Sequence, residues 1–212
     1  RNVFQVIRQC LDEGREGPLS MCAINLSGSS IGDDKFLDDT QREVDEKAVH
    51  TMARRQPMAI DLREIVGSIR ISNDLERIGD VADKIARMLT DNANKPQPPL
   101  VSLENMGRRT IKMLHDVLDA FARMDLEAAI AVYKEDDKVD REYESIIREL
   151  MTYMMEDPRT IPQVLNVLWA ARAIERVGDR CQHICEYIVY YVKGKDVRHT
   201  KADELSDLLG KH

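Results

Sequence analysis

The sequence has few aromatic residues, no long apolar run and no excess of positive charge. Aromatic side chains make up 5% of the 212 residues, and the aliphatic and helix-forming residues that dominate are typical of a helical protein. The net charge of -7 argues against nucleic-acid binding, which requires a basic face. No apolar run approaches the ~20 residues that span a bilayer, and no signal-peptide pattern opens the chain. We therefore expect a cytoplasmic protein with no membrane span.

The sequence also lacks the common metal-thiolate and catalytic motifs. Its four cysteines form no CxxC pair. Cys181 and Cys185 are one helical turn apart, and we interpret them as small apolar residues in a reducing compartment. We find no phosphate loop, no HExxH and no Ser-His-Asp pattern, which points away from catalysis.

One short motif occurs twice. Leu75–Asp80 (LERIGD) returns as Ile174–Asp179 (IERVGD), 99 residues later (175 minus 76). In each copy Glu and Asp stand at i and i+4, so both carboxylates lie on one helix face, where they repel each other. The repetition suggests a compensating cation, and the alternative is two solvated acidic faces. A repeat of this length also favours two domains.

Each copy of the motif is preceded by a second acidic pair with the same spacing. The pairs are Asp34 with Asp38 and Asp136 with Asp140. Proline-marked turns separate each pair from the motif that follows, so we expect two antiparallel helical hairpins. Asp38 and Glu76 lie 19 residues on either side of Pro57 (57 minus 38; 76 minus 57). Four carboxylates per repeat can therefore converge between two helices, as in bundle-core metal sites.

The periodicity of the chain predicts long helices separated by breakers. We expect helices over residues 33–55, 58–91, 103–121, 126–156 and 162–193, with Asp125 as an N-cap and Gly194 as a C-cap. Val49 and Leu62 are assigned to apolar helix faces. The proline-rich residues 92–99 predict a linker. The resulting units are residues 1–95, of which 1–32 are atypical, residues 96–194, and a weakly ordered or briefly helical tail at 195–212.

An all-oxygen ligand set favours Mg, Mn, Ca or Fe over structural Zn. His183, four residues after Asp179, is an optional additional ligand. Gly79 and Gly178 lie inside helices at a cost of ~1 kcal/mol each, which suggests a close approach by a neighbouring helix or by metal-bridging atoms. Three functions remain open at this point: a metal-binding adaptor, a carboxylate-bridged metal hydrolase or oxidase, and a helical scaffold without metal.

Several segments of the chain have a characteristic sequence. They are Arg55-Gln56-Pro57, Asp61-Leu62-Arg63, residues 73–80, 113–121 and 150–157, and residues 174–180. Together these segments resemble the PhoU family of phosphate-transport regulators. The resemblance covers roughly residues 33–200, and its paired E/DxxxD motifs are specific. Before Asp33 the chain departs from the family, because Gly, Ser and Pro interrupt the long first helix expected there. The departure falls on the first helix of the first bundle.

The resemblance implies an all-α fold of two pseudo-symmetric three-helix bundles, each able to hold a multinuclear cluster of Fe, Mn, Mg or Zn. The first cluster comprises Asp34, Asp38, Glu76 and Asp80, and the second cluster comprises Asp136, Asp140, Glu175 and Asp179. It further implies a non-enzymatic negative regulator of the phosphate-starvation response. Such a protein relays the state of a phosphate ABC transporter, through its ATPase, to a membrane sensor histidine kinase. We also expect a symmetric homodimer.

Overall fold

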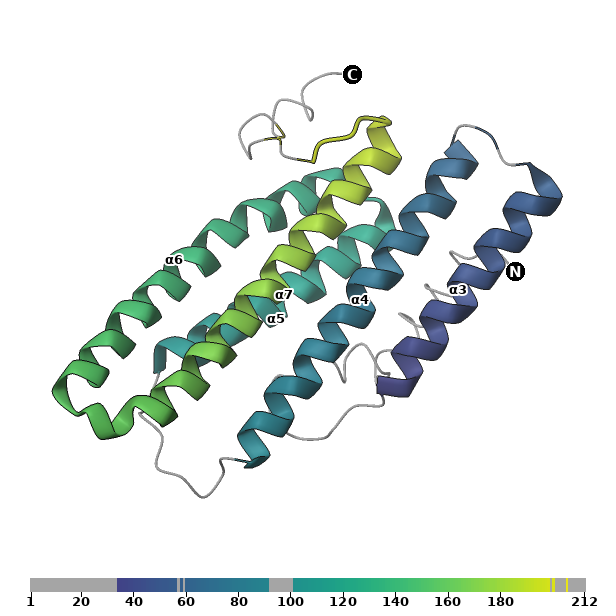
Figure 1. Ribbon diagram of the computed structural model, residues 1–212. Helices are drawn as coiled ribbons and strands as arrows, with labels where there is room; N and C mark the ends of the chain where they lie inside the picture. The colour runs from purple at the N-terminus through teal and green to yellow at the C-terminus, as the bar shows by residue number, and fades with distance from the viewer. Residues whose placement is uncertain are drawn as a thin grey trace.

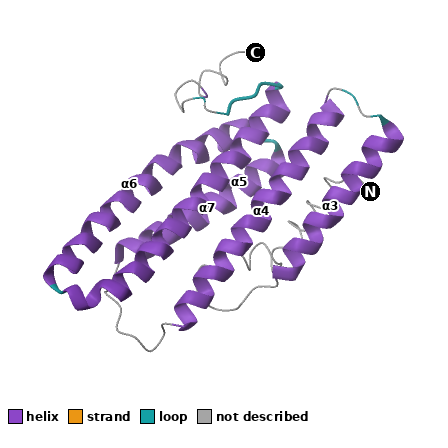
Figure 2. Cartoon of the chain, viewed as in Figure 1, coloured by secondary structure: helices purple, strands orange, loops and turns teal. Residues whose placement is uncertain are grey.

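The computed structural model describes residues 34–56, 58, 60–91, 101–198, 200 and 205. Within these residues the chain is all-α and contains no strand (Figure 2), which confirms the predicted fold class. The long helices are α3 (Asp34–Arg55), α4 (Ile60–Asp91), α5 (Val101–Arg123), α6 (Leu126–Glu156) and α7 (Ile161–Lys193), and η2 (Pro158–Thr160) is a 3-10 turn. No described helix is long and apolar enough to cross a membrane.

The helix ends follow local signals in the sequence. Asp125 caps α6, because its side chain accepts a hydrogen bond from the backbone N–H of Ala128 at 3.0 Å. Gly194 ends α7 with a φ of 67°, and its N–H donates to the carbonyl of Tyr190 at 2.9 Å. Both predicted caps are therefore confirmed. The expectations for residues 1–32, Pro57 and the linker at 92–99 lie outside the described residues.

The helices lie side by side in an elongated molecule. α5, α6 and α7 form a three-helix bundle, α4 packs against α7, and α3 packs against α4 (Figure 1). The α3–α4 turn and the α6–α7 turn lie at opposite ends of the molecule. Because α4 contacts α7 directly, the two repeats share an interface, and the domain boundary at residue 95 stays a prediction.

The core is built from aliphatic side chains of all five helices. Its largest fully buried members include Val44, Ile71, Ile78, Met106, Met113, Leu114, Ile146, Leu150, Ile184 and Ile188. Two predicted apolar-face positions are wrong, because Val49 is 62% exposed and Leu62 is 41% exposed. The inward-facing residues of α3 include Val44, which the same pattern placed on the apolar face, and Ala48. Val49 lies about 100° further around the helix than Ala48, so it faces away from α4.

The chain after α7 packs onto the second bundle. Val197 and Leu205 are buried in the core, and the hydroxyl of Tyr133 donates to the carbonyl of Thr200 at 3.1 Å. The described part of the tail is therefore packed, and Leu205 is helical, which agrees with the alternative of a short helix. Its burial was not predicted, because the few apolar residues of this charged stretch give too weak a periodic signal.

A buried polar contact joins the two repeats. Asp74 on α4 is almost inaccessible, and Arg180 on α7 donates to its carboxylate at 2.7 Å. The Nδ1 of His183 lies 3.8 Å from the same carboxylate. Tyr187 lies one turn after His183 on α7. The guanidinium of Arg70 on α4 lies over its ring, 5.6 Å from the centroid. The α4–α7 interface is thus held by charge as well as by apolar packing.

Candidate metal centre

The second cluster lies between α6 and α7. Asp136 is 3% exposed and Glu175 is 8% exposed, whereas Asp179 is half-buried and Asp140 is exposed. Gly178 explains how the two helices come together here, because a Cβ atom at this position would lie 2.5 Å from Oδ1 of Asp136. The α7 backbone therefore approaches the Asp136 carboxylate so closely that a side chain at this position would require the carboxylate to shift, which confirms the close approach by a neighbouring helix expected at this glycine.

The carboxylates of the second cluster act on one another electrostatically. Burial raises the pKa of Asp136 to about 7, and the negative charges of Asp140, Asp179 and Glu175 add to the increase. The pKa values of Asp140 and Glu175 are also raised, first by burial and then by Asp179. The structure thus brings the four predicted residues into one acidic site.

Two oxygens of this site are buried without a hydrogen-bond partner. They are Oδ1 of Asp136 and Oε2 of Glu175. Buried carboxylate oxygens without partners are costly, and hard cations bind such oxygens, so the donor chemistry fits a divalent or trivalent metal ion. Among the described residues, however, no three His, Cys, Asp or Glu side chains are grouped so that they could hold one ion. The site is therefore a set of donors without a preformed coordination sphere.

The first cluster is more open. Asp38 on α3 and Glu76 on α4 are half-buried, and Asp80 is exposed and lies 3.4 Å from Nζ of Lys84. The pKa of Glu76 is raised by partial burial and then by Asp80 and Asp38. These three residues are thus close enough to interact. Asp34 begins α3, and its side chain lies outside the described residues.

Other polar residues near the motifs have different partners. His183 faces Asp74 on α4, and the nearby carboxylate raises the pKa of the imidazole. It is therefore directed toward the α4–α7 interface. Arg176 within the second motif is exposed, whereas Arg172 contacts the carboxylate of Glu175. Arg172 was not among the residues predicted for the site. Its i, i+3 spacing to Glu175 is the sequence signal that could have identified it.

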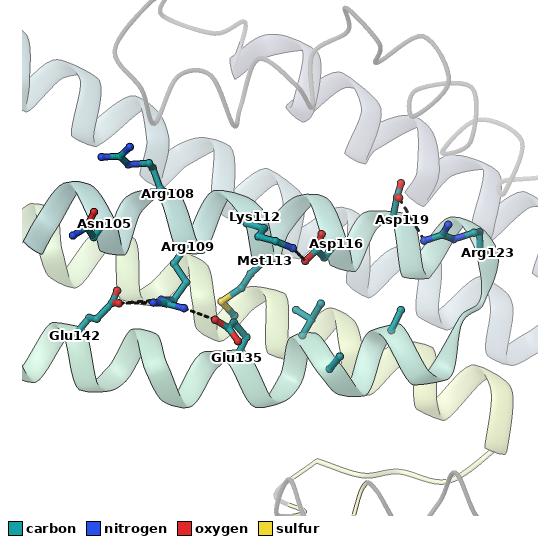
Figure 3. Close-up of a pocket in the computed structure, with 13 residues that line it drawn as sticks. Asn105, Arg108, Arg109, Lys112, Met113, Asp116, Asp119, Arg123, Glu135 and Glu142 are labelled. Atoms are coloured by element: carbon teal, nitrogen blue, oxygen red, sulfur yellow. Dashed lines mark hydrogen bonds and ion pairs between the residues drawn. The ribbon is translucent and has the colours of Figure 1, made fainter.

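A separate polar groove of about 780 Å³ lies between α5 and α6 (Figure 3). Arg109 donates to both Glu135 and Glu142, so it bridges the two helices. Lys112 pairs with Asp116 along α5. The Arg109 pairs therefore help to hold α5 against α6, whereas the Lys112 pair lies within α5.

Comparisons with known proteins agree on one family. A family model described as the PhoU domain matches residues 25–89 and 103–188. The phosphate-specific transport system accessory protein PhoU of Escherichia coli K12 is 56% identical over 186 residues, which span 87% of this chain and 77% of that protein. The protein of the same description from Edwardsiella tarda is 60% identical over 170 residues, or 80% of this chain and 70% of that protein.

Two crystal structures share the fold. PhoU from Pseudomonas aeruginosa superposes with a TM-score of 0.77 at 37% identity and covers 91% of this chain and 93% of its own. The phosphate transport system regulatory protein PhoU from Streptococcus pneumoniae has a TM-score of 0.72 at 25% identity, with 92% and 90% covered. The likeness therefore extends over almost the whole described chain.

Proposed function

Because the chain belongs to the PhoU family, we propose that it restrains phosphate uptake and phosphate-starvation signalling as the accessory protein of a phosphate-specific transport system. The observation that carries this proposal is the 56% identity over 186 residues to an accessory protein of that description. Members of this family are accessory and regulatory proteins, and the chain is not an enzyme. The lack of catalytic motifs in the sequence agrees with that role.

The partners we propose are the ATPase of the phosphate ABC transporter and a sensor histidine kinase. In this role the protein is a cytoplasmic homodimer that associates peripherally with these membrane complexes. The description of its relatives as transport-system accessory proteins supports the transporter contact. The kinase contact and the homodimer rest on family resemblance alone.

Complementation tests the regulatory role. The chain is expressed in a bacterium that lacks its own relative, and a phosphate-starvation promoter drives a reporter. We expect the chain to restore repression in phosphate-rich medium. Accumulation of folded protein without repression would contradict the role. Co-purification with the transporter ATPase and with the kinase then tests the two partners separately, and light scattering tests the dimer.

We further propose that both clusters bind metal ions of the Fe, Mn, Mg or Zn class, in mononuclear or multinuclear form. The eight carboxylates are Asp34, Asp38, Glu76, Asp80, Asp136, Asp140, Glu175 and Asp179. The partnerless oxygens of Asp136 and Glu175 support binding at the second cluster. A bound cation supplies positive charge that offsets the repulsion among these carboxylates, and so stabilises the contact between α6 and α7.

Two measurements test the metal proposal: elemental analysis of the purified protein, and thermal melts in chelator and in added Mn²⁺. We expect Glu175→Ala combined with Asp179→Ala to reduce bound metal and to remove the metal-dependent rise in Tm. The matched pair, Glu76→Ala with Asp80→Ala, should cause a smaller loss, because the first cluster is more exposed. Unchanged metal content in both double variants would sink the assignment.

A further inference from the structure

The second cluster contains a cation of the protein's own. The guanidinium Nη1 of Arg172 contacts Oε1 of Glu175, one of the two most buried carboxylates of the site. The positive charge of Arg172 lowers the pKa values of both Glu175 and Asp140, against the larger effect of burial. Arg172 therefore supplies part of the countercharge that the acidic site requires.

We propose that Arg172 is a built-in counter-ion that competes with metal for the second cluster and leaves Glu175 when metal binds. The inference rests on the metal binding proposed above. One oxygen of Glu175 is occupied by the guanidinium and the other has no partner. A metal ion bound to both oxygens lies close to the guanidinium and repels it, because both groups are cationic, so metal binding drives Arg172 away from Glu175.

Arg172 already has a second partner, which it would keep after leaving Glu175. The guanidinium carbon of Arg172 lies 5.8 Å from the centroid of the Tyr143 ring on α6. This is within the range of a cation–π contact, which can hold the charge without a carboxylate. The Arg172 side chain is 43% exposed, whereas that of Glu175 is 10% exposed, so the arginine is the partner that can move.

The neighbouring arginines of α7 are differently engaged. Arg176 is exposed, and Arg180 is held at 2.7 Å by Asp74 on α4, away from the second cluster. The first half has no matching arginine, because the position equivalent to Arg172 is Asn73 (172 minus 99), a neutral residue that pairs with Gln41. The first cluster has a cation of another kind, because the exposed Lys84 lies 3.4 Å from Asp80, so the competition by an arginine belongs to the second cluster.

Mn²⁺ titration by calorimetry tests the inference with Arg172→Gln and the matched control Arg176→Gln. Both variants remove one positive charge from the same face of α7, one turn apart. We expect Arg172→Gln to tighten Mn²⁺ binding at the second cluster about tenfold, the size typical of releasing a hydrogen bond between charged groups. The control should change the dissociation constant by less than about threefold, since Arg176 is exposed.

Two further measurements test the inference without relying on tighter Mn²⁺ binding by Arg172→Gln. In chelator, Arg172→Gln should melt at a lower temperature than Arg176→Gln, because Glu175 loses its partner. Tyr143→Leu should weaken Mn²⁺ binding about threefold, because the guanidinium that leaves Glu175 then lacks the ring contact that would otherwise remain to it. The Tyr143 variant keeps the test informative if Arg172→Gln fails to fold.

The outcomes separate this inference from the metal proposal. If the wild type binds Mn²⁺ and Arg172→Gln binds it equally or more weakly, the counter-ion role is wrong and the metal site stands. If the wild type does not bind and Arg172→Gln does, Arg172 blocks the site and the inference is supported. If neither protein binds Mn²⁺, both proposals fail.

Discussion

The two copies of the ExxxD motif have the same sequence pattern but different environments. In the second half Asp136 and Glu175 are buried and keep oxygens without partners. In the first half the Asp80 side chain is 50% exposed and lies beside Lys84. Water and a surface lysine can offset the charge of the first cluster, whereas only a cation or protonation can offset that of the second.

The comparison shows that burial, and not spacing, decides how strongly a carboxylate pair needs a cation. Gly178 brings the α7 backbone within reach of Asp136, and this approach takes the carboxylate out of water. The same i, i+4 spacing in the first half leaves Glu76 only half-buried. We therefore expect the second cluster to bind metal more tightly than the first. Without metal, it should lower the free energy of unfolding more than the first cluster does.

Breaking the ion pair between α4 and α7 should have the largest effect on the free energy of unfolding. Arg180→Leu leaves the buried Asp74 carboxylate without its guanidinium, and we expect the free energy of unfolding to fall by roughly 3 kcal/mol, as is usual for half of a buried ion pair. Urea unfolding measures the change. Lys84→Leu, which breaks an exposed pair in the first half, should cost less than about 0.5 kcal/mol. Equal effects would contradict a charged link between the halves.

Weakening the contact between the chain after α7 and the second bundle should have the next largest effect on the free energy of unfolding. Leu205 is 1% exposed, so Leu205→Ala should cost about 2 to 3 kcal/mol through lost burial and a new cavity. Leu165→Ala on exposed α7 surface is the matched control and should change stability by less than about 1 kcal/mol. Thermal melts compare the two. A neutral Leu205→Ala would mean that the tail does not stabilise the core.

The pH dependence of stability should distinguish the clusters. The pKa of Asp136 rises from 3.8 when unfolded to about 7 when folded, so the folded state binds more protons between these values. In chelator, the wild type should therefore lose stability as the pH rises from 4 to 7. Asp136→Asn should flatten this loss and add roughly 1 to 3 kcal/mol at pH 8.

In the first half the variant for comparison is Glu76→Gln, because the side chain of Asp34, which corresponds to Asp136, lies outside the described residues. We expect it to change the free energy of unfolding at pH 8 by less than about 0.5 kcal/mol, because Glu76 is only half-buried. Denaturant unfolding at several pH values in chelator provides the comparison. A similar increase in the free energy of unfolding for both variants would show that the two clusters destabilise the protein equally without metal.

Two glycine variants should give small effects of opposite sign. Gly178→Ala places a methyl group against Asp136, so we expect a net loss of about 1 kcal/mol despite the better helix propensity of Ala. Gly107→Ala meets nothing closer than 3.9 Å and should gain about 0.5 to 1 kcal/mol. Circular dichroism melts measure both. Stabilisation by both variants would argue against tight packing at the second cluster.

Helix boundaries were predictable because their causes are local. Asp125 and Gly194 act on the backbone within four residues, and the i, i+4 carboxylates share a face in any helix. The wrong positions, Val49 and Leu62, are apolar residues whose exposure depends on the neighbouring helices. Nothing within a single helix indicates which of its apolar residues will find a partner.

The sequence by itself determined the all-α class, the two hairpins and the placement of four acidic residues in each repeat. Only the tertiary structure decided that Asp136 and Glu175 are buried, that Arg172 contacts Glu175, and that Arg180 crosses to Asp74. The physical reason is that spacing along a helix sets the direction of a side chain. Its solvation and its partner depend on the element that packs opposite.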